Sequence, residues 1–289
     1  MIMDLWKKLK FYGELVKFEH TIFALPFALS SIVILMKSLP TAEQVFWILL
    51  ALISARTAGM CFNRWLDRAF DEKNPRTSTW PHVTGLVKDW EIKGLIFLSI
   101  VVFILSSLFL NKLALFLSPI VIILLFLYPL AKRFTFYPHL ILGMIYFLIP
   151  IAVGIALNAD ISKEALLLGI AMAFWVAGFD VLYSLQDYEF DLKMGLKSIP
   201  VRFGIKRALQ IARIFHFVTF LSLLILGIVY SYAGWFYFLG LSLLTLFLIY
   251  EHRLISEKDL SKINKAFFTV NGYISIIYFF VVLLDRLVF

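Results

Sequence analysis

The sequence predicts an all-α polytopic membrane protein, and three observations carry that prediction. Of its 289 residues, 62% are hydrophobic and only 16% are charged, whereas soluble domains are about 45–50% apolar and about 25% charged. The mean hydropathy is +0.90. The apolar residues also fall into runs of membrane-crossing length. This composition excludes disordered, collagen-like and disulfide-scaffold proteins.

Nine segments are long enough to cross a bilayer, because a spanning helix needs about 20 mostly apolar residues. Most connections between them are short. Two connections are longer and polar, at residues 63–91 and 187–207, so extramembrane structure is expected there. The predicted spans are residues 20–37, 43–62, 93–111, 113–130, 138–158, 164–186, 208–231, 233–250 and 266–285.

The basic residues predict the orientation of these spans. When Arg56, which falls inside a span, is set aside, 22 Lys and Arg residues lie at the N-terminus or in connections on its side of the membrane, and 4 lie on the other side. Cytoplasmic loops carry such an excess, which places the N-terminus and both long loops in the cytoplasm and the C-terminus outside. Because the basic residues follow the membrane loops, no nucleic-acid partner is expected.

The chain is expected to form a single domain, residues 1–289, with a weak internal repeat. A span that ends in acids spaced by four and runs into a long polar loop occurs twice, four helices apart. Corresponding positions of this kind suggest two pseudo-symmetric halves around one shared site. The halves are residues 1–130 and 138–250, approximately, and the ninth span follows them.

The second span and the loop after it carry the first chemically informative pattern. Asn63, Asp67 and Asp71 are spaced at i, i+4 and i+8, which aligns them along one face of an α-helix. Arg56 precedes Asn63 by seven residues, so it is expected two turns deeper on the same face.

A second acidic pair follows the sixth span. Asp187 and Asp191 again stand at i and i+4, and Asp180 precedes Asp187 by seven residues. Like charges at this spacing destabilise a helix, and intramembrane acids cost about 2.5–3.5 kcal/mol. Both pairs therefore need a compensating cation. Oxygen ligands without a His or Cys cluster suit magnesium and not zinc.

Charge counting points to a phosphorylated substrate. Four aspartates with two magnesium ions form a neutral platform, and a diphosphate would supply the phosphate ligands that magnesium prefers. The substrate that joins a diphosphate to a membrane-buried tail is a polyprenyl diphosphate. Basic residues on the cytoplasmic side that would hold the diphosphate are Arg76, Lys132, Arg133 and Lys197.

Other interpretations of these residues remain open. An acid-rich loop beside a span is commonly an interfacial salt-bridge network, although two such runs, each followed by basic residues, favour a substrate site. A proton-coupled secondary transporter also uses intramembrane carboxylates, but such carriers place them near the midplane on broken helices. The five histidines, at positions 20, 82, 139, 216 and 252, show no ligand spacing and are expected to be structural.

At these residues the sequence resembles the UbiA superfamily of intramembrane prenyltransferases. Asn63-x3-Asp67-x3-Asp71 matches the first motif of that family, and Asp187-x3-Asp191 matches the second. The resemblance covers nearly the whole chain and is closest to the 4-hydroxybenzoate polyprenyltransferase branch, through Gln186-Asp187 and the run 198–204. Further matching runs are residues 19–26, 74–77, 128–133 and 195–200.

The resemblance implies nine helices in a ring around a central cavity that cytoplasmic loops cap. It implies Mg²⁺-dependent transfer of a polyprenyl group to a small aromatic acceptor, such as 4-hydroxybenzoate, for quinone biosynthesis. Two ions are expected, with Mn²⁺ as a substitute, and no obligate protein partner is inferred. The implied roles are metal binding and catalysis for Asp67, Asp71, Asp187 and Asp191, metal binding for Asn63, diphosphate binding for Lys132, Arg133, Lys197 and Arg76, and acceptor binding for Arg56 and Tyr183.

The sequence departs from the family at one informative position. The family commonly has an arginine where this chain has Trp80, in the run Trp80-Pro81-His82. A basic residue that would touch the diphosphate is therefore absent there. This departure keeps open a prenyltransferase of the same superfamily that acts on another acceptor, such as geranylgeranylglyceryl phosphate or haem.

Overall fold

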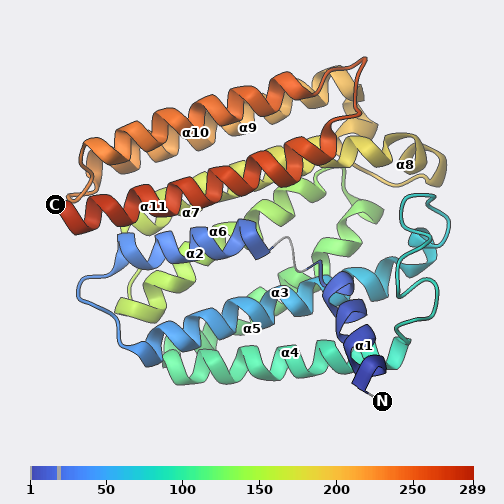
Figure 1. The fold of residues 1–289 in the computed structure, drawn as a ribbon, viewed down its shortest axis with the longest axis horizontal. Helices are drawn as coiled ribbons and strands as arrows, with labels where there is room; N and C mark the ends of the chain where they lie inside the picture. Colours follow the sequence, from blue (N-terminus) through green and yellow to red (C-terminus); the bar gives the residue numbers. More distant parts are fainter. Residues whose placement is uncertain (1, 18–20) are drawn as a thin grey trace. The chain divides into compact units, whose positions relative to one another are not determined.

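The computed structural model describes residues 2–17 and 21–289 (Figure 1). Glu19 and His20 belong to the run 19–26, and His20 begins the first predicted span; both lie outside the described residues.

The described residues form helices and no named strand, so the all-α prediction is confirmed; an isolated bridge joins Ser256 to Asp259. The helices are α1 (Ile2–Leu15), α2 (Thr21–Leu35), α3 (Ala42–Asp71), α4 (Asp89–Leu110), α5 (Lys112–Phe134), α6 (Pro138–Asn158), α7 (Lys163–Ser184), the 3₁₀ helix η2 (Leu185–Asp187), α8 (Tyr188–Met194), α9 (Ile199–Val229), α10 (Trp235–Leu254), the π-helix η3 (Lys265–Val270) and α11 (Asn271–Val288).

Within the described part of the chain, eight helices are long and apolar enough to cross a membrane. In this count α7, η2 and α8 form one helix, and η3 and α11 form another. The segment expected to be the first span contains α2, in which the apolar helix of residues 25–35 is shorter than the other candidates. The chain is therefore a multi-pass membrane protein, and the ninth span stays a prediction.

The chain separates into two compact units, which we describe individually. The first unit contains residues 1–21 and 41–130, and the second unit contains residues 22–40 and 131–289. The predicted single domain, its two halves and the ring of helices stay predictions.

The first unit packs α3 against its neighbours through aromatic side chains. The ring of Trp47 on α3 stacks on Phe109 of α4, with 4.5 Å between ring centroids. The ring of Phe62 meets Phe126 of α5 edge to face at 5.4 Å. Such pairs stabilise helix contacts beyond their apolar area. These two ring contacts pack α3, which carries Asn63, Asp67 and Asp71, against α4 and α5.

Helix α1 is tied to the start of α4 by one carboxylate. Glu91 accepts hydrogen bonds from Lys8 Nζ at 2.6 Å and from Tyr12 Oη at 2.9 Å. The ion pair and its hydrogen bond raise the pKa of the Lys8 ammonium above its usual value. The N-terminal helix is therefore anchored next to the loop that follows α3.

The second unit is built around α7. Figure 1 shows α9 and α10 running side by side as an antiparallel pair, with α7 and α11 next to them. Trp175 on α7 is fully buried and donates a hydrogen bond to Asn271 of α11 at 2.8 Å. A Cβ atom on Gly143 of α6 would lie 2.6 Å from the carbonyl oxygen of Ala173, so a glycine allows α6 and α7 to approach closely.

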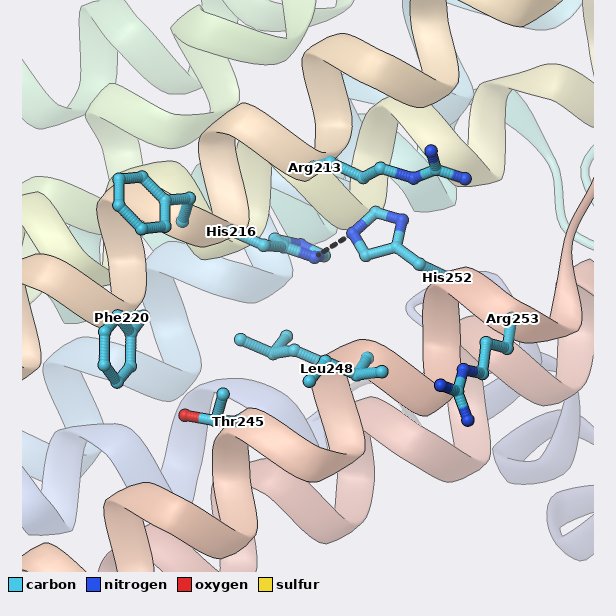
Figure 2. Close-up of a pocket in the computed structure, with 9 residues that line it drawn as sticks. Arg213, His216, Phe220, Thr245, Leu248, His252 and Arg253 are labelled. Carbon is cyan, nitrogen blue, oxygen red and sulfur yellow. Dashed lines mark hydrogen bonds between the residues drawn. The ribbon is translucent and has the colours of Figure 1, made fainter.

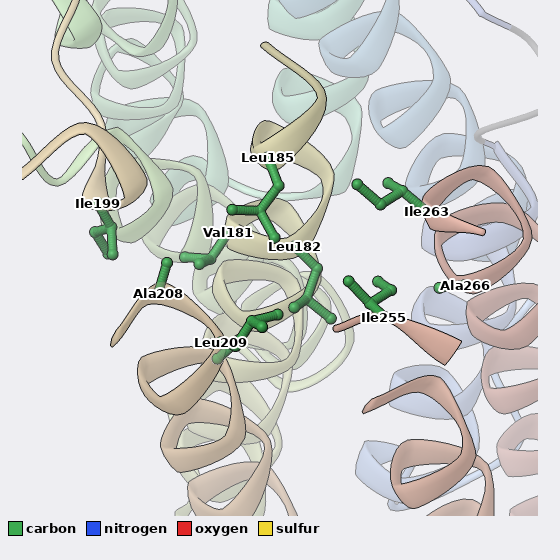
Figure 3. Close-up of a cluster of buried hydrophobic side chains, with 10 residues drawn as sticks. Val181, Leu182, Leu185, Ile199, Ala208, Leu209, Ile255, Ile263 and Ala266 are labelled. Carbon is green, nitrogen blue, oxygen red and sulfur yellow. The ribbon is translucent and has the colours of Figure 1, made fainter. Parts of the chain in front are cut away.

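A buried hydrophobic cluster supports the end of α7, where the second acidic pattern begins (Figure 3). Side chains from α7, α9 and the segment after α10 meet in it, so three separate parts of the sequence fix the position of η2. Its members include Val181, Leu182, Leu185, Ile199, Ala208, Leu209, Ile255, Ile263 and Ala266.

Candidate metal and phosphate sites

The first acidic pattern lies on one continuous α-helix, as its spacing predicts. Asn63, Asp67 and Asp71 all belong to α3, and Asp71 is its last residue. The Nδ2 atom of Asn63 donates a hydrogen bond to Oδ2 of Asp67 at 3.2 Å. Asp67 is 2% exposed. The helix therefore brings two oxygen-bearing side chains into contact at its polar end.

A histidine holds the last residue of this pattern. Nε2 of His82 lies 2.9 Å from Oδ2 of Asp71, and the His82 side chain is buried. The hydroxyl of Thr77 donates to the backbone carbonyl of Asp71 at 2.8 Å. The loop after α3 thus folds back onto the helix end. His82 was expected to be only structural, and its contact with a predicted metal ligand gives it a place in the candidate site.

Three cations surround the indole ring of Trp80. The guanidinium carbon of Arg64 lies 4.0 Å from the ring centroid, that of Arg76 lies 5.5 Å away, and Nζ of Lys17 lies 4.9 Å away. A tryptophan face attracts cations electrostatically. Trp80 therefore gathers basic side chains around itself, which its sequence neighbourhood does not predict.

Arg64 is the buried arginine beside the first pattern. It is 5% exposed, and its Nη1 donates to Oδ1 of Asn63 at 3.1 Å. Its Nε donates to the carbonyl oxygen of Leu15 at 3.2 Å. Arg56, which the sequence singled out, lies deeper on α3, half-buried, with Nη2 donating to the carbonyl oxygen of Lys17 at 3.4 Å. The sequence feature that indicates a role for Arg64 in this site is its position directly after Asn63.

The second acidic pattern differs from the regular helical face that its spacing predicts. Asp187 ends the 3₁₀ helix η2, with φ −100° and ψ 5°, whereas Asp191 lies in α8. The α-helix is therefore interrupted at Asp187 instead of running through both residues. Both carboxylates remain half-buried. Gly195, with φ +68°, then ends α8 in the left-handed conformation that glycine adopts without strain.

Asp180 and Tyr183, on the turns before Asp187, have partners within the second unit. Nδ1 of His139 donates to Oδ2 of Asp180 at 2.6 Å, and Nε2 of His139 accepts from the backbone N–H of Ile199 at 3.4 Å. The ring of Tyr183 packs on Phe267 with 4.1 Å between centroids. The sequence pattern did not predict that His139 would link α6, α7 and α9.

The structure brings together the basic residues predicted from two distant parts of the sequence. The backbone N–H of Lys197 donates to the carbonyl oxygen of Lys132 at 2.7 Å. Nζ of Lys197 donates to the carbonyl oxygen of Phe134 at 3.3 Å. Lys132 and Arg133 end α5. Lys132, Arg133 and Lys197 therefore form one basic cluster in the second unit.

The ligand atoms of the two acidic patterns fit magnesium. The side chains of both patterns offer oxygen atoms, which Mg²⁺ prefers. Among the described residues, no three His, Cys, Asp or Glu side chains form a group that could hold a metal by themselves. That arrangement agrees with the way proteins commonly bind Mg²⁺, through one or two carboxylates with phosphate oxygens and waters completing the shell.

Comparisons with known proteins agree with these features. The family model described as "UbiA prenyltransferase family" matches residues 24–276. A 4-hydroxybenzoate octaprenyltransferase of Pasteurella multocida is 31% identical over 283 residues, covering 96% of this chain and 97% of that protein. One from Francisella tularensis subsp. tularensis is also 31% identical, covering 90% of this chain and 89% of that protein.

Solved structures share the fold. The apo structure of a UbiA homolog from Aeropyrum pernix K1 has a TM-score of 0.83 and 31% identity, covering 92% of this chain and 98% of that one. A UbiA homolog from Archaeoglobus fulgidus, bound to DMAPP and Mg²⁺, has a TM-score of 0.73 at 18% identity, covering 96% and 99% of the two chains.

Proposed function

This chain belongs to the UbiA prenyltransferase family, and we propose that it transfers a polyprenyl group from polyprenyl diphosphate to a small aromatic acceptor within the membrane. It is a multi-pass membrane enzyme of the prenyltransferase class. The observation that carries the proposal is the presence of both aspartate motifs, each at the polar end of a helix long and apolar enough to cross a membrane.

The acceptor we propose is 4-hydroxybenzoate or a close analogue, for quinone biosynthesis. Curated relatives that cover nearly the whole chain are 4-hydroxybenzoate octaprenyltransferases. The alternative acceptor is geranylgeranylglyceryl phosphate, since a digeranylgeranylglyceryl phosphate synthase shares the fold at 19% identity. Haem is a further alternative within the superfamily, and a proton-coupled transporter is the remote one.

The metal proposal assigns oxygen ligands in both units. Asn63, Asp67 and Asp71 would hold one ion, and Asp187 and Asp191 would hold a second. Mg²⁺ would neutralise the negative charge of the diphosphate as it leaves, and Mn²⁺ would substitute. His82 would orient Asp71 through the hydrogen bond described above, as partners of metal ligands commonly do.

The chain's own basic residues would bind the leaving group. Lys132, Arg133 and Lys197 form the cluster that would hold the diphosphate, and Arg76 is a further candidate for diphosphate binding. Preorganised positive charge stabilises the charge that develops when the C–O bond to the prenyl group breaks. The acceptor ring then attacks the allylic carbon, and loss of the ring proton restores aromaticity.

The acceptor would be bound by Arg56 and Tyr183. A guanidinium group pairs well with a carboxylate, and Arg56 is half-buried on α3, deeper in the span than Asn63. We also propose that the N-terminus and both polar loops face the cytoplasm and the C-terminus faces outside. A cysteine introduced at Ser78 should then react with an impermeant reagent only from the cytoplasmic side, and labelling from outside would contradict this orientation.

The decisive experiment is mass spectrometry of the products that purified protein forms from a panel of acceptors and prenyl diphosphates. We expect a prenylated 4-hydroxybenzoate that requires added Mg²⁺ and disappears in excess chelator. Prenylation of geranylgeranylglyceryl phosphate instead would transfer the assignment to the alternative acceptor. Full turnover in excess chelator would contradict the metal proposal.

A further inference from the structure

We propose that a pocket between α9 and α10 binds an anionic phospholipid. The pocket lies within the second unit and has a volume of about 520 Å³. None of the aspartates or lysines assigned above lines it, so this inference does not depend on the proposed function. Its lining residues are Arg213, His216, Phe217, Phe220, Thr245, Leu248, Ile249, His252 and Arg253.

The two arginines stand at the same height on an antiparallel helix pair. At about 1.5 Å per residue, Arg213 lies about 24 Å along α9 from Val229, and Arg253 lies about 27 Å along α10 from Trp235. A short connection joins α9 to α10 at that end. Because the hydrocarbon core is about 30 Å thick, both guanidinium groups reach the same membrane interface, where arginine side chains extend toward headgroups.

The charge of the pocket complements a phosphodiester. Arg213 and Arg253 are exposed, and no ion pair to either is found in the part of the chain that the structure describes. None of the described residues that line the pocket carries a carboxylate, and the buried Glu251 lies behind it, 3.6 Å from Nδ1 of His216. Figure 2 shows the two guanidinium groups on either side of His252, at one end of the pocket. This end presents two positive charges where lipid phosphates lie.

The opposite end of the pocket suits an acyl chain. Phe220 and Thr245 lie at that end (Figure 2). The side chain of Phe217 is 62% exposed, although it belongs to a membrane-crossing helix, so the pocket opens toward the surrounding lipid. Leu248 is buried and lines the pocket from α10. One pocket therefore joins a basic end to an apolar end, as the headgroup and chain of a phospholipid require.

The floor of the pocket is fixed by hydrogen bonds. Nε2 of His216 donates to the carbonyl oxygen of Trp175 at 3.3 Å, and Nε2 of His252 donates to Nδ1 of His216 at 2.9 Å. These imidazoles link α7, α9 and α10, so the pocket is preformed. Recognition of the headgroup then falls to Arg213 and Arg253.

The chemistry of the lining favours a phospholipid over a prenyl diphosphate. A diphosphate carries about three negative charges and is commonly bound with Mg²⁺, whose protein ligands are oxygen atoms of carboxylates and amides. Among the described residues that line the pocket, none carries a carboxylate or a side-chain amide. The one side-chain oxygen in that lining is the hydroxyl of Thr245, which already donates to the carbonyl oxygen of Leu241. A singly charged phosphodiester matches two arginines without a metal.

Native mass spectrometry of the full chain tests the proposal. The protein would be released from micelles that contain equal amounts of phosphatidylglycerol and phosphatidylcholine. We expect preferential retention of one phosphatidylglycerol, weakened about fivefold by Arg213→Gln or Arg253→Gln and about twentyfold or more by both. Arg207→Gln is the matched control, because Arg207 is an exposed arginine of α9 that does not line the pocket.

A second variant tests the apolar half and guards against misfolding. Thr245→Trp would fill the pocket, keep both arginines and reduce phosphatidylglycerol retention, while prenyl diphosphate affinity should stay unchanged in all variants. A phosphatidylglycerol with a photoreactive acyl chain should label α9 and α10. Equal retention of both lipids, equal loss in Arg207→Gln, labelling elsewhere, or a second copy of the chain covering this face would each overturn the proposal.

Discussion

His82 and Trp80 define the surroundings of the first aspartate motif in a way that spacing alone does not predict. His82 holds the carboxylate of Asp71, and Trp80 gathers Arg64, Arg76 and Lys17 around its ring. The loop after α3 thus contacts the carboxylate of Asp71 through His82 and positions the nearby basic side chains through Trp80.

His82 should act as a positioning residue for metal binding. His82→Ala removes the hydrogen bond that orients Asp71, and loss of such a partner commonly weakens metal affinity about 10–100-fold. The Mg²⁺ activation curve should therefore shift to higher concentration by about that factor. His82→Gln, which keeps an N–H donor, should recover part of the shift. An unchanged curve in a folded His82→Ala protein would limit His82 to a structural role.

Trp80 should stabilise the fold through its cations. Trp80→Phe keeps an aromatic face, whereas Trp80→Arg adds a fourth positive charge beside Arg64. A cation–π contact contributes about 0.5–2 kcal/mol, so Trp80→Arg should lower the free energy of unfolding by about 1–2 kcal/mol more than Trp80→Phe. Thermal unfolding of the detergent-solubilised variants measures this difference. Equal Tm values for the two variants would show that the ring does not stabilise the cation cluster.

At the scale of helices, close packing and local breaks decide where the polar side chains lie. Gly143 allows α6 to approach α7, and the 3₁₀ turn of η2 ends at Asp187, before Asp191 on α8. The hydrophobic cluster around Leu185 holds that turn in place. The position of the second motif therefore depends on packing contacts far from it in the sequence.

Gly143→Ala should destabilise the contact between α6 and α7. The added Cβ would meet the backbone oxygen of Ala173 at 2.6 Å, and overpacking of this kind costs about 1–3 kcal/mol. Gly94→Ala is the matched control, because a Cβ at Gly94 of α4 meets open space. Thermal unfolding should show a clear loss for Gly143→Ala and little change, or a gain from helix propensity, for Gly94→Ala.

At the scale of the whole molecule, the two aspartate motifs belong to different compact units. If both units act on one leaving group, the motifs should depend on each other functionally. Rates of single and double variants measure that dependence.

Asp67→Asn and Asp187→Asn should each reduce turnover by about 10²-fold or more, because each removes a charged ligand that we propose for a catalytic ion. The double variant should lose much less than the product of the two effects, since both act on the same diphosphate. Single-turnover rates and diphosphate binding, after each variant is shown to fold, give the coupling. Independent multiplication of the two losses would indicate that the motifs do not share a substrate.

Acceptor binding forms a separate part of the same test. Arg56→Ala should raise the KM for a carboxylated aromatic acceptor and leave prenyl diphosphate affinity nearly unchanged. The opposite result, loss of diphosphate binding with an unchanged acceptor KM, would place Arg56 in the phosphate site.

The sequence alone determined the membrane class, most of the helices and the first motif. Apolar runs of about 20 residues favour membrane helices whatever their neighbours are, and the spacing of Asn63, Asp67 and Asp71 is a local property of α3 that the structure reproduces. The types and flanking motifs of Lys132 and Lys197 indicate both residues, and the structure adds the backbone hydrogen bond between them.

Only the tertiary structure decided the partners of these residues. Contacts between Asp71 and His82, Asp180 and His139, or Trp80 and Lys17 join residues 11 to 63 positions apart, and their spacing in the sequence carries no helical or strand period. The break at Asp187 likewise arises where local helix geometry yields to packing of η2 on α9 and on the segment after α10. Helix periodicity is determined by neighbouring residues, whereas contacts between residues far apart in the sequence depend on how the whole chain packs.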